Sequence, residues 1–297
     1  MDAEQKNLLD HWNIEVEHTD GLCDKIMIIN GQYVYKRVRR KDHGRRMLDL
    51  TKAMANQGLP VPRVVETKTG GHWVESDDSY HFLMTLQPGT HLASENVLHK
   101  PEETGLIAKA LADLHRALDH LPQTVNLPNY SIYSELNGWI GTALKDFGQE
   151  TFAFSIFDQL AEKLEAAFPS LPHQAIHRDF HLKNVLFQDK QVSGYIDFDL
   201  SQRTARVYDL AYFSVGLLAE YFSDLDLRNQ WPVFHERFVR DYHRHNPLQE
   251  EEKAVMGLFM VAIEILFVAY YSRTGKAKEA KEIDQIVEWL WQRVVQA

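Results

Sequence analysis

Cysteine is almost absent from the 297 residues: Cys23 stands alone, which excludes an intrachain disulfide framework and indicates a reducing compartment. Positive charge is also scarce, because 32 lysines and arginines stand against 42 acidic residues and leave a net charge of -10. This balance disfavours nucleic acid or an anionic membrane as a partner. The N-terminus lacks the apolar core of a signal peptide, and neither repeats nor low-complexity tracts occur. We therefore expect a cytoplasmic protein with no nucleic-acid or membrane partner.

Long hydrophobic runs are rare as well. The run from residue 254 to residue 271 has the near-minimal length of a membrane span, but Glu264 interrupts it. The length allows one large domain or two lobes with a substantial core, and we assign the interrupted run to a buried helix of that core. Glu264 would then require a partner inside the core, and the sequence does not identify one.

Residues 176–186 and 195–199 carry a dense set of polar residues. The run His-Arg-Asp ends at Asp179, and Asn184 follows five residues later, a spacing that matches the protein-kinase catalytic loop H-R-D-x-x-x-x-N. In that loop the aspartate orients the attacking hydroxyl and the asparagine holds a magnesium ion. Asp197 is the candidate for the remaining metal carboxylate. The residues between Asn184 and Asp197 read as a hairpin, which should return Asp197 to the mouth of the loop that carries Asp179.

Each part of this pattern has a simpler interpretation when it is taken alone. A single His-x-Asp occurs by chance, and Ile-Asp-Phe at residues 196–198 ends many ordinary strands. The joint pattern is more specific and indicates phosphotransferase ancestry. A zinc site is the other interpretation, because His173, His177 and His181 are evenly spaced. The motif H-E-x-x-H requires glutamate after its first histidine, however, and Arg178 stands there, so we disfavour zinc.

The chain resembles the aminoglycoside phosphotransferase and choline kinase superfamily of small-molecule kinases, whose fold is that of protein kinases. Besides the catalytic motif, the similarity covers five segments, at residues 33–37, 58–62, 86–89, 112–115 and 208–211. Residues 47–50, 58–63 and 193–198 are similar to bacterial homoserine kinases of this fold. The resemblance implies an α+β, bilobal, protein-kinase-like fold with a small antiparallel-sheet N-lobe and a larger, mainly helical C-lobe. It assigns residues 1–87 to nucleotide binding, with the hinge at their end, and residues 88–297 to the catalytic loop and substrate site.

The first lobe contains a strong hairpin signal, the turn Asn30-Gly31 between strand-like residues 25–29 and 32–38. Lys36 is therefore a strand residue. Alone it would be a solvated side chain, but the resemblance makes it the clamp for nucleotide phosphates. The family helix that follows, expected at residues 42–57, presents a glutamate to this lysine. Here the helix has none, and Asp49 is the better placed of its two aspartates, the alternative being an exposed helix charge.

Three other features of the first lobe bear on nucleotide binding. The phosphate-covering loop at residues 19–23 departs from G-x-G-x-x-G, because it contains one glycine, Gly21, whose neighbouring amides are still candidates for phosphate contact. Basic residues cluster at residues 36–46, as a solvated helix start or as an attraction for ATP or an anionic substrate. Residues 82–86 are expected to form the last strand and the hinge, with Met84 and Leu86 in the adenine pocket or the core.

The second lobe reads as helical. Residues 101–118 have helical periodicity, and His115 on their apolar face is expected to be a structural hydrogen-bonder. Four long helical segments follow from about residue 207, with breaks near Asp224, residues 246–247 and residues 273–275. Asp209, at the start of the first of these helices, is expected to cap it or to tie down the catalytic loop.

The sequence thus predicts an enzyme that uses ATP and Mg²⁺ to phosphorylate a hydroxyl of a small polar metabolite, which is an amino alcohol, homoserine, an amino sugar or an aminoglycoside. The predicted catalytic residues are Asp179, Asn184 and Asp197, of which the last two bind the metal, and the predicted nucleotide-binding residues are Lys36, Asp49, Met84 and Leu86. Asp199 is either an acid behind the metal ligands or an auxiliary metal contact. The alternative is a kinase-fold protein that binds nucleotide without turnover. The sequence does not fix an oligomeric state.

Overall fold

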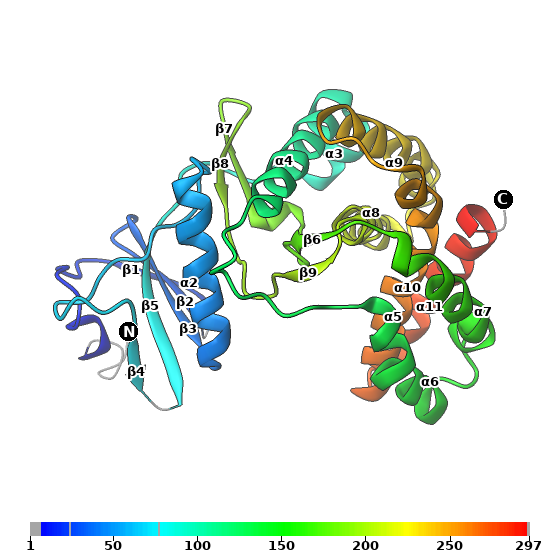
Figure 1. Cartoon of the computed structure of the whole chain (residues 1–297), viewed down its shortest axis with the longest axis horizontal. Helices are drawn as coiled ribbons and strands as arrows, with labels where there is room; N and C mark the ends of the chain where they lie inside the picture. Colours follow the sequence, from blue (N-terminus) through cyan, green and yellow to red (C-terminus); the bar gives the residue numbers. More distant parts are fainter. Residues whose placement is uncertain (1–6, 24, 77, 296–297) are drawn as a thin grey trace. The chain divides into compact units, whose positions relative to one another are not determined.

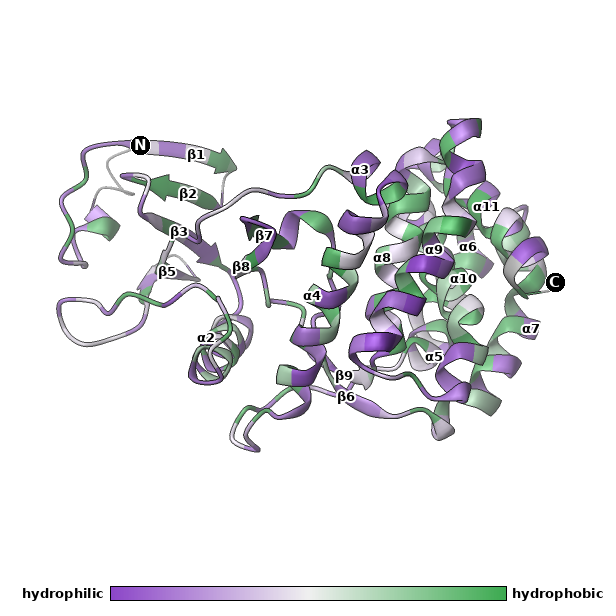
Figure 2. Ribbon diagram, turned by 90° about the horizontal axis from the view of Figure 1, so that it is seen from above, coloured by the Kyte–Doolittle hydropathy of each residue, from purple (hydrophilic) through white to green (hydrophobic). Residues whose placement is uncertain are grey.

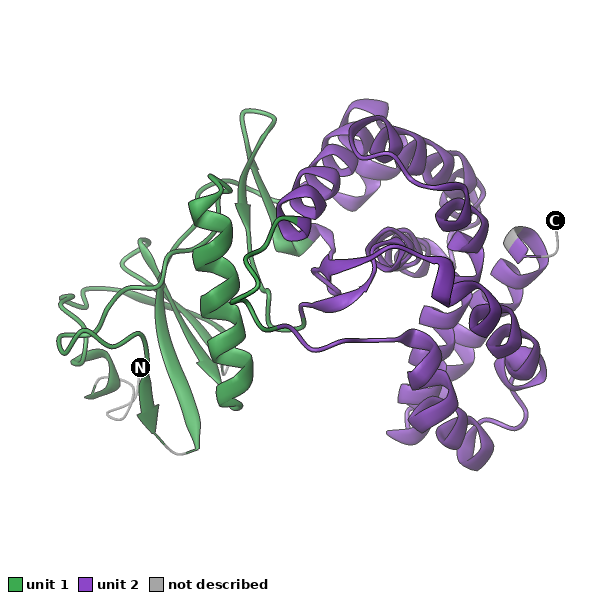
Figure 3. Cartoon of the chain, viewed as in Figure 1, with its two compact units in different colours: residues 1–91, 120–126, 183–200 green, residues 92–119, 127–182, 201–297 purple. Residues whose placement is uncertain are grey.

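The computed structural model describes residues 7–23, 25–76 and 78–295, and it divides the chain into two compact units (Figure 3). Unit 1 comprises Met1–His91, His120–Asn126 and Lys183–Leu200, and unit 2 comprises Leu92–Asp119, Leu127–Leu182 and Ser201–Ala297. The N-terminal segment considered above for a signal peptide begins with residues 1–6, which lie outside the described residues.

Unit 1 is built on a five-stranded antiparallel sheet with the order β1-β2-β3-β5-β4 (Figure 1). Its strands are β1 (Thr19–Cys23), β2 (Ile26–Ile29), β3 (Tyr33–Val38), β4 (Val74–Ser76) and β5 (Ser79–Thr85). Asn30 and Gly31 have φ of 53° and 63°, the two positive values that a tight type I′ hairpin turn requires. The backbone N–H of Gln32 donates to the oxygen of Ile29 across this turn (3.0 Å). The predicted hairpin is confirmed.

One face of this sheet is covered by α2 (Lys41–Asn56). Met47 of the helix packs with Val38, Phe82 and Met84 of the strands. The close approach requires a glycine, because a Cβ on Gly44 would lie 2.6 Å from the Phe82 ring. The helix predicted from the sequence at residues 42–57 is confirmed.

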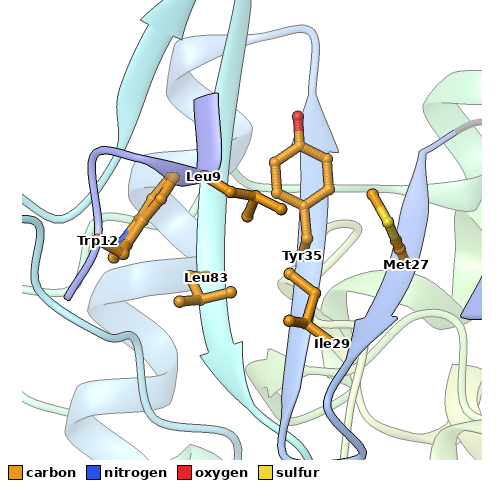
Figure 4. Close-up of a cluster of buried hydrophobic side chains, with 6 residues drawn as sticks. All are labelled: Leu9, Trp12, Met27, Ile29, Tyr35 and Leu83. Carbon is orange, nitrogen blue, oxygen red and sulfur yellow. The ribbon is translucent and has the colours of Figure 1, made fainter. Parts of the chain in front are cut away.

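The opposite face of the sheet holds a separate apolar cluster, formed by Leu9, Trp12, Met27, Ile29, Tyr35 and Leu83 (Figure 4). The Trp12 indole N–H donates to the oxygen of Val65 (3.0 Å), so the buried ring is also satisfied at its polar end. Because side chains alternate along a strand, the inward position of Tyr35 in this cluster places Lys36 on the other face, which α2 covers. The sheet therefore holds Lys36 on its helix-covered side.

A second hairpin completes unit 1. It consists of β7 (Val185–Gln188) and β8 (Gln191–Tyr195), joined by Asp189 and Lys190 at φ of 51° and 60°. The strands and the polar turn predicted in this stretch are confirmed. The hairpin carries residues 183–200 into the same compact unit as the first 91 residues.

The segment after β5 is bound tightly to this hairpin. Thr90 and Phe187 exchange backbone hydrogen bonds (2.9 and 2.8 Å), and the Ser193 hydroxyl donates to the oxygen of Pro88 (2.6 Å). Gly89 has φ of 110°, and a Cβ there would lie 2.6 Å from the Phe187 oxygen, so no other residue fits without displacement. Tyr195 N–H donates to the oxygen of Pro60 (2.8 Å).

Unit 2 is mainly helical, with one two-stranded antiparallel sheet. The helices are α3 (Ser94–His99), α4 (Pro101–Asp119), α5 (Ile132–Glu135), α6 (Gly141–Phe147), α7 (Phe152–Ala167), α8 (Val207–Tyr221), α9 (Leu225–His245), α10 (Glu250–Arg273) and α11 (Ala277–Leu290), and the strands are β6 (His173–Ile176) and β9 (Gln202–Ala205). Figure 1 shows α8 in the middle of this unit, and polar residues colour much of α9 purple in Figure 2.

The helix boundaries after residue 207 follow local signals. Asp224 caps α9, since its carboxylate accepts from the backbone N–H groups of Asp226 and Leu227. Gln249 and Glu252 form a capping box at the start of α10, and Gly275 beyond its end has φ of 74°. The four predicted helices and their three breaks are confirmed. The predicted lobe boundary at residues 87/88 stays a prediction, and the sequence did not anticipate that residues 183–200 join the first unit.

Helix α10 contains the long apolar run. In the described part of the chain it is the one helix long and apolar enough to cross a membrane by length and composition alone. Most of its apolar stretch is buried inside the protein, and Phe259, Met260 and Ile263 have no exposed surface. A core helix of a folded protein has this pattern, so the predicted core position is confirmed.

Candidate active site

The loop after β6 is held by a buried carboxylate. Asp209, in the first turn of α8, accepts hydrogen bonds from the backbone N–H groups of His177 (2.9 Å) and Arg178 (2.8 Å). The His115 ring lies between Asp209 (3.0 Å) and the hydroxyl of Tyr242 (2.7 Å). His115, His177, Asp209 and Tyr242 are buried and Arg178 is half-buried, so the network fixes the backbone just before Asp179. The structural roles predicted for Asp209 and His115 are confirmed.

Asp179 is half-buried at the tip of this loop, with 22% of its side chain exposed. The hydroxyl of Tyr212, from α8, donates to its Oδ1 (2.7 Å), and Nε2 of His181 lies 3.5 Å from its Oδ2. Burial by itself raises the pKa of the Asp179 carboxyl. The hydrogen bonds from His181 and Tyr212 and the charges of His181 and His177 outweigh burial, and the pKa lies below the ordinary value for aspartate. Asp179 is therefore ionised near neutral pH.

Arg178 adopts a backbone conformation that few non-glycine residues adopt, with φ of 67°. Its guanidinium lies over the ring of Tyr130, 3.9 Å from the centroid, and that ring packs edge-on against Tyr208. The cation–π contact and the bond to Asp209 hold the residue in this conformation. Backbone strain of this kind persists only where the surrounding structure stabilises it, and it is typical of functional sites.

The hairpin of unit 1 brings Asn184 and Asp197 to the same end. The backbone N–H of Ile196 donates to the oxygen of Asn184 (3.0 Å), and Val185 pairs with Tyr195 beside them. Asp197 also has a positive φ, of 65°. Thus an amide side chain and a carboxylate, thirteen residues apart in sequence, lie at the base of one hairpin.

Lys36 meets the same end of the hairpin. Its ammonium group lies 2.7 Å from Asp197 Oδ1 and 2.9 Å from Asp199 Oδ1, with only 13% of its side chain exposed. Burial lowers the pKa of Lys36, but the charges of Asp199 and Asp197 outweigh burial, and the pKa is raised above its ordinary value. The lysine therefore stays charged, and Asp199 is one of its two direct partners.

The predicted pair between Lys36 and Asp49 is wrong for this structure. Lys36 binds Asp197 and Asp199, and Asp49 is not among its partners in the described residues. The reason is the register of α2. Met47 marks the face packed on the sheet, and Asp49, two residues further, lies about 200° around the helix from it. Asp49 therefore points away from the sheet that carries Lys36.

The other predicted nucleotide-binding residues are placed in unit 1 as follows. Met84 is buried in the cluster with Val38, Met47 and Phe82, so it is a core residue, and its contact with adenine stays a prediction. Leu86 is half-buried, and its backbone N–H donates to the oxygen of Gln32 (2.8 Å), so that donor is already used.

Gly21 lies in β1, and a Cβ added there would have no atom within 4 Å, so packing does not require glycine at this position. The basic cluster begins α2, where Asp42 pairs with Arg40 (2.7 Å) and Arg46 (3.6 Å).

The side chains at the hairpin base suit a hard divalent cation. Asp197 and Asp199 offer carboxylate oxygens with 40% and 24% of their side chains exposed, and Asn184 offers an amide oxygen. Mg²⁺ prefers one or two carboxylates together with phosphate oxygens and water, so this donor set fits it. In the described residues, no group of three or more His, Cys, Asp or Glu side chains is arranged to hold a metal ion by itself.

Two residues of the site were missed or left undecided at the sequence level. Tyr212 was not identified, although its position three residues after Asp209 places it on α8, one turn further along the same helix. Asp199 is predicted to be either an acid behind the metal ligands or an auxiliary metal contact, and the structure shows it as a partner of Lys36. Unit 2 also contains a cavity of 520 Å³ whose lining includes Tyr130, Glu135 and His173.

Comparison with solved structures defines the class of fold. An amicoumacin kinase bound to AMP-PNP, Ca²⁺ and amicoumacin superposes with a TM-score of 0.73 at 14% identity, covering 96% of this chain and 94% of that one. A microcompartment-associated aminopropanol kinase superposes with a TM-score of 0.69 at 16% identity, covering 97% of each chain. The chain therefore has the kinase-like α+β fold of these enzymes, with an antiparallel sheet followed by a mainly helical part. The predicted fold class is confirmed.

The family follows from the sequence. Residues 27–258 match the model of the phosphotransferase enzyme family, and the chain belongs to that family. A homoserine kinase of Zymomonas mobilis subsp. mobilis is 24% identical over 227 residues, which cover 74% of this chain. The aligned region spans 66% of that kinase, just under two thirds of its length. The predicted resemblance to small-molecule phosphotransferases and homoserine kinases is confirmed.

Proposed function

We propose that the protein is an ATP-dependent O-phosphotransferase that acts on a hydroxyl of a small polar metabolite. The observation that carries the proposal is the state of Asp179, an ionised, half-buried carboxylate whose orientation is fixed by Tyr212 and by the loop bonded to Asp209. A carboxylate of this kind is suited to accept a hydrogen bond from an attacking hydroxyl. Asn184 follows it by five residues, which matches the spacing that phosphoryl transfer uses.

In the proposed reaction, the phosphoryl group passes from ATP to the acceptor hydroxyl. The acceptor oxygen forms a new bond to the γ-phosphorus of ATP, and the bond from that phosphorus to the β,γ-bridging oxygen breaks with its electron pair on ADP. The hydroxyl proton passes to Asp179 and then to solvent. Lys36 holds its charge for the phosphates, because Asp197 and Asp199 raise its pKa. Asn184 and Asp197 would hold Mg²⁺, with Asp199 beside them, and the metal would neutralise charge on the β- and γ-phosphates.

The names of the relatives suggest which small polar metabolites carry the acceptor hydroxyl. Homoserine and aminopropanol, named in the relatives, both carry a hydroxyl and an amino group. These names, and the acidic net charge of -10, support an amino alcohol, homoserine, an amino sugar or an aminoglycoside as the acceptor. Action in the cytoplasm, without nucleic-acid or membrane partners, stays a prediction.

The proposal is tested by measuring ADP release from MgATP with a panel of amino alcohols, homoserine, amino sugars and aminoglycosides. We expect turnover with at least one acceptor, and Asp179→Asn should lower kcat at least about 100-fold, as the loss of a general base does. Calorimetry should find MgATP affinity of Asp179→Asn within about threefold of wild type, because Asp179 serves the acceptor. Asp49→Asn is the matched control and should keep its rate. Binding of ATP without transfer to any acceptor would favour a nucleotide-binding scaffold.

A further inference from the structure

Glu264, near the middle of α10, is a buried acid for which the proposed reaction has no use. Its side chain is 2% exposed, and its Oε2 has no hydrogen-bond partner among the residues that the structure describes. Burial raises the pKa of Glu264 to about 8. An unpaired buried carboxyl is destabilising, so a folded protein that keeps one requires an explanation.

The same helix contains a second buried glutamate, Glu252, which does have a cationic partner. Glu252 has no exposed surface, and it accepts from the Arg206 guanidinium at both oxygens (2.8 and 2.9 Å) and from the backbone N–H of Gln249 (2.9 Å). Within the described residues, the fold therefore supplies a cation for Glu252 and none for Glu264. A missing cation is what a ligand with an ammonium group would provide.

Glu264 lies on the side of α10 that packs near Tyr212, the residue that donates to Asp179. Helix α10 packs against α8, and the rings of Phe267 and Tyr212 are 6.5 Å apart across this contact. Glu264 lies three residues before Phe267, on the same face of α10. Its charge also acts on the Tyr212 hydroxyl, whose pKa is raised by burial first and then by Asp179, Asp209 and Glu264. That hydroxyl is the group that donates to Asp179.

Aromatic rings line the same face. Tyr212, Phe267 and Tyr271 are all half-buried, and Phe267 stacks on Tyr271 with ring centres 6.4 Å apart. The faces of half-buried rings attract a cation that has lost part of its water. One of these rings already has a cation near its face, because the Lys276 ammonium lies 5.7 Å from the centroid of Tyr271. This face of α10 therefore presents the two features that recognise an ammonium group, which are the π faces of the rings and the carboxylate of Glu264.

We propose that Glu264 is the residue that selects the acceptor, by binding the ammonium group of an amino alcohol whose hydroxyl is oriented by Asp179. Tyr212, Phe267 and Tyr271 form the aromatic wall along which this cation lies. The inference rests on the proposed kinase function and narrows its acceptor to a compound with a free amino group close to the reacting hydroxyl. The substrate ammonium completes a charge pair that the folded protein alone leaves open.

The test compares an amino alcohol, 3-aminopropan-1-ol or homoserine, with an analogue in which a methyl group replaces the amine. For wild type we expect a strong preference for the amine. Glu264→Gln should lower kcat/KM for the amino alcohol at least about 30-fold, mainly through KM, because removing one partner of a buried charge pair has effects of that size. For the amine-free analogue it should change kcat/KM less than about threefold, and this also shows that the variant folds.

Glu135→Gln is the matched control, since Glu135 lies at the separate cavity of unit 2. It should leave the preference for the amine unchanged. The inference is overturned if Glu264→Gln loses kcat/KM equally on both acceptors. It is also overturned if Glu135→Gln loses the preference for the amine and Glu264→Gln keeps it. Either result would leave the kinase function intact. Absence of all turnover would instead refute the function. Calorimetric titration of the amino alcohol then decides the inference, which fails if wild type and Glu264→Gln bind it equally.

Discussion

At the scale of single residues, Tyr212 acts directly on the charge of Asp179, and its hydrogen bond lowers the pKa of that carboxyl next after the bond from His181. Its hydroxyl donates to the carboxylate at 2.7 Å, and this bond helps to hold the pKa of Asp179 below the ordinary value although burial acts in the other direction. A group with a lowered pKa contributes stability above its unfolded pKa and loses that contribution as the pH falls through its folded pKa. The same carboxylate must be ionised for catalysis, so activity should persist to low pH.

Tyr212→Phe should therefore raise the pKa of Asp179 and move the acid limb of the kcat/KM profile to higher pH. The expected shift is about one pH unit, the size of a hydrogen bond to a charged group. Tyr221→Phe removes a hydroxyl from the same helix, where it contacts Ser94 (2.7 Å), and should not move the limb. An unchanged acid limb in Tyr212→Phe would show that the hydroxyl does not tune Asp179.

Lys36 offers a second prediction, based on its two acid partners. Lys36→Ala and Asp197→Ala should each weaken MgATP binding at least tenfold, and the double variant should be no worse than the stronger single variant, because the two residues act as a unit. Lys36→Ala combined with Asp49→Ala should give only the effect of Lys36→Ala. Titration calorimetry with MgATP measures all of these, and a marked effect of Asp49→Ala would contradict the assigned partners.

How far single residues can be predicted depends on the distance in sequence between partners. Asp179 and Asn184 lie within one motif, so their spacing carries the information. The partner of Lys36 is 161 or 163 residues away, and no local pattern distinguishes Asp199 from Asp49 as its acid. The helix suggested Asp49 by family order, but a short side chain on the wrong face of α2 cannot reach the sheet.

At the scale of elements, the contact between the segment after β5 and the β7–β8 hairpin depends on one glycine. Gly89→Ala would place a Cβ 2.3 Å from Ser193 Oγ and 2.6 Å from the Phe187 oxygen, at a φ that alanine disfavours. The free energy of unfolding should fall by about 1–3 kcal/mol or more, as overpacking does. Gly21→Ala, with open space around it, should change stability by less than about 0.5 kcal/mol. Urea unfolding distinguishes the two, and equal losses would contradict the clash.

Helix α10 gives a prediction for stability against pH. Because burial raises the pKa of Glu264 from 4.5 in the unfolded chain to about 8, the folded state keeps a proton that the unfolded state has lost, and stability falls as the pH rises between these values. Glu264→Gln removes this fall, so its stability relative to wild type should increase from pH 5 to pH 8. Glu252→Gln should destabilise at both values, since it breaks a buried pair with Arg206. A Glu264→Gln variant whose relative stability does not change with pH would contradict the assigned environment.

Elements with strong local signals were predictable. The turn Asn30-Gly31 indicated the first hairpin, and the breaks near Asp224, residues 246–247 and residues 273–275 indicated where α9 and α10 begin and end. Strands β6 and β9 were not predicted, because each has four residues and their pairing joins positions some thirty residues apart. Their sheet depends on tertiary contacts, which override weak local preference.

At the scale of the whole molecule, unit 1 is assembled from three segments of the chain. A fragment of residues 1–91 lacks Phe187 and Ser193, which hold the segment around Gly89, and it lacks the carboxylates that pair with Lys36. We expect this fragment to be digested rapidly by protease and to unfold without a cooperative transition. The same fragment joined through a Gly/Ser linker to residues 183–200 should be more resistant. Equal resistance of the two would show that the hairpin is dispensable.

The division of unit 1 among three segments also has a consequence for biosynthesis. The chain passes between the two units five times, and unit 1 receives its last segment only at Leu200. At typical rates of translation the ribosome needs roughly 5–20 s to extend the chain from residue 91 to residue 200. During that interval the nascent sheet lacks the hairpin that completes it. The yield of native protein should therefore depend on a chaperone that shields the sheet, or on the rate at which unit 2 is synthesised.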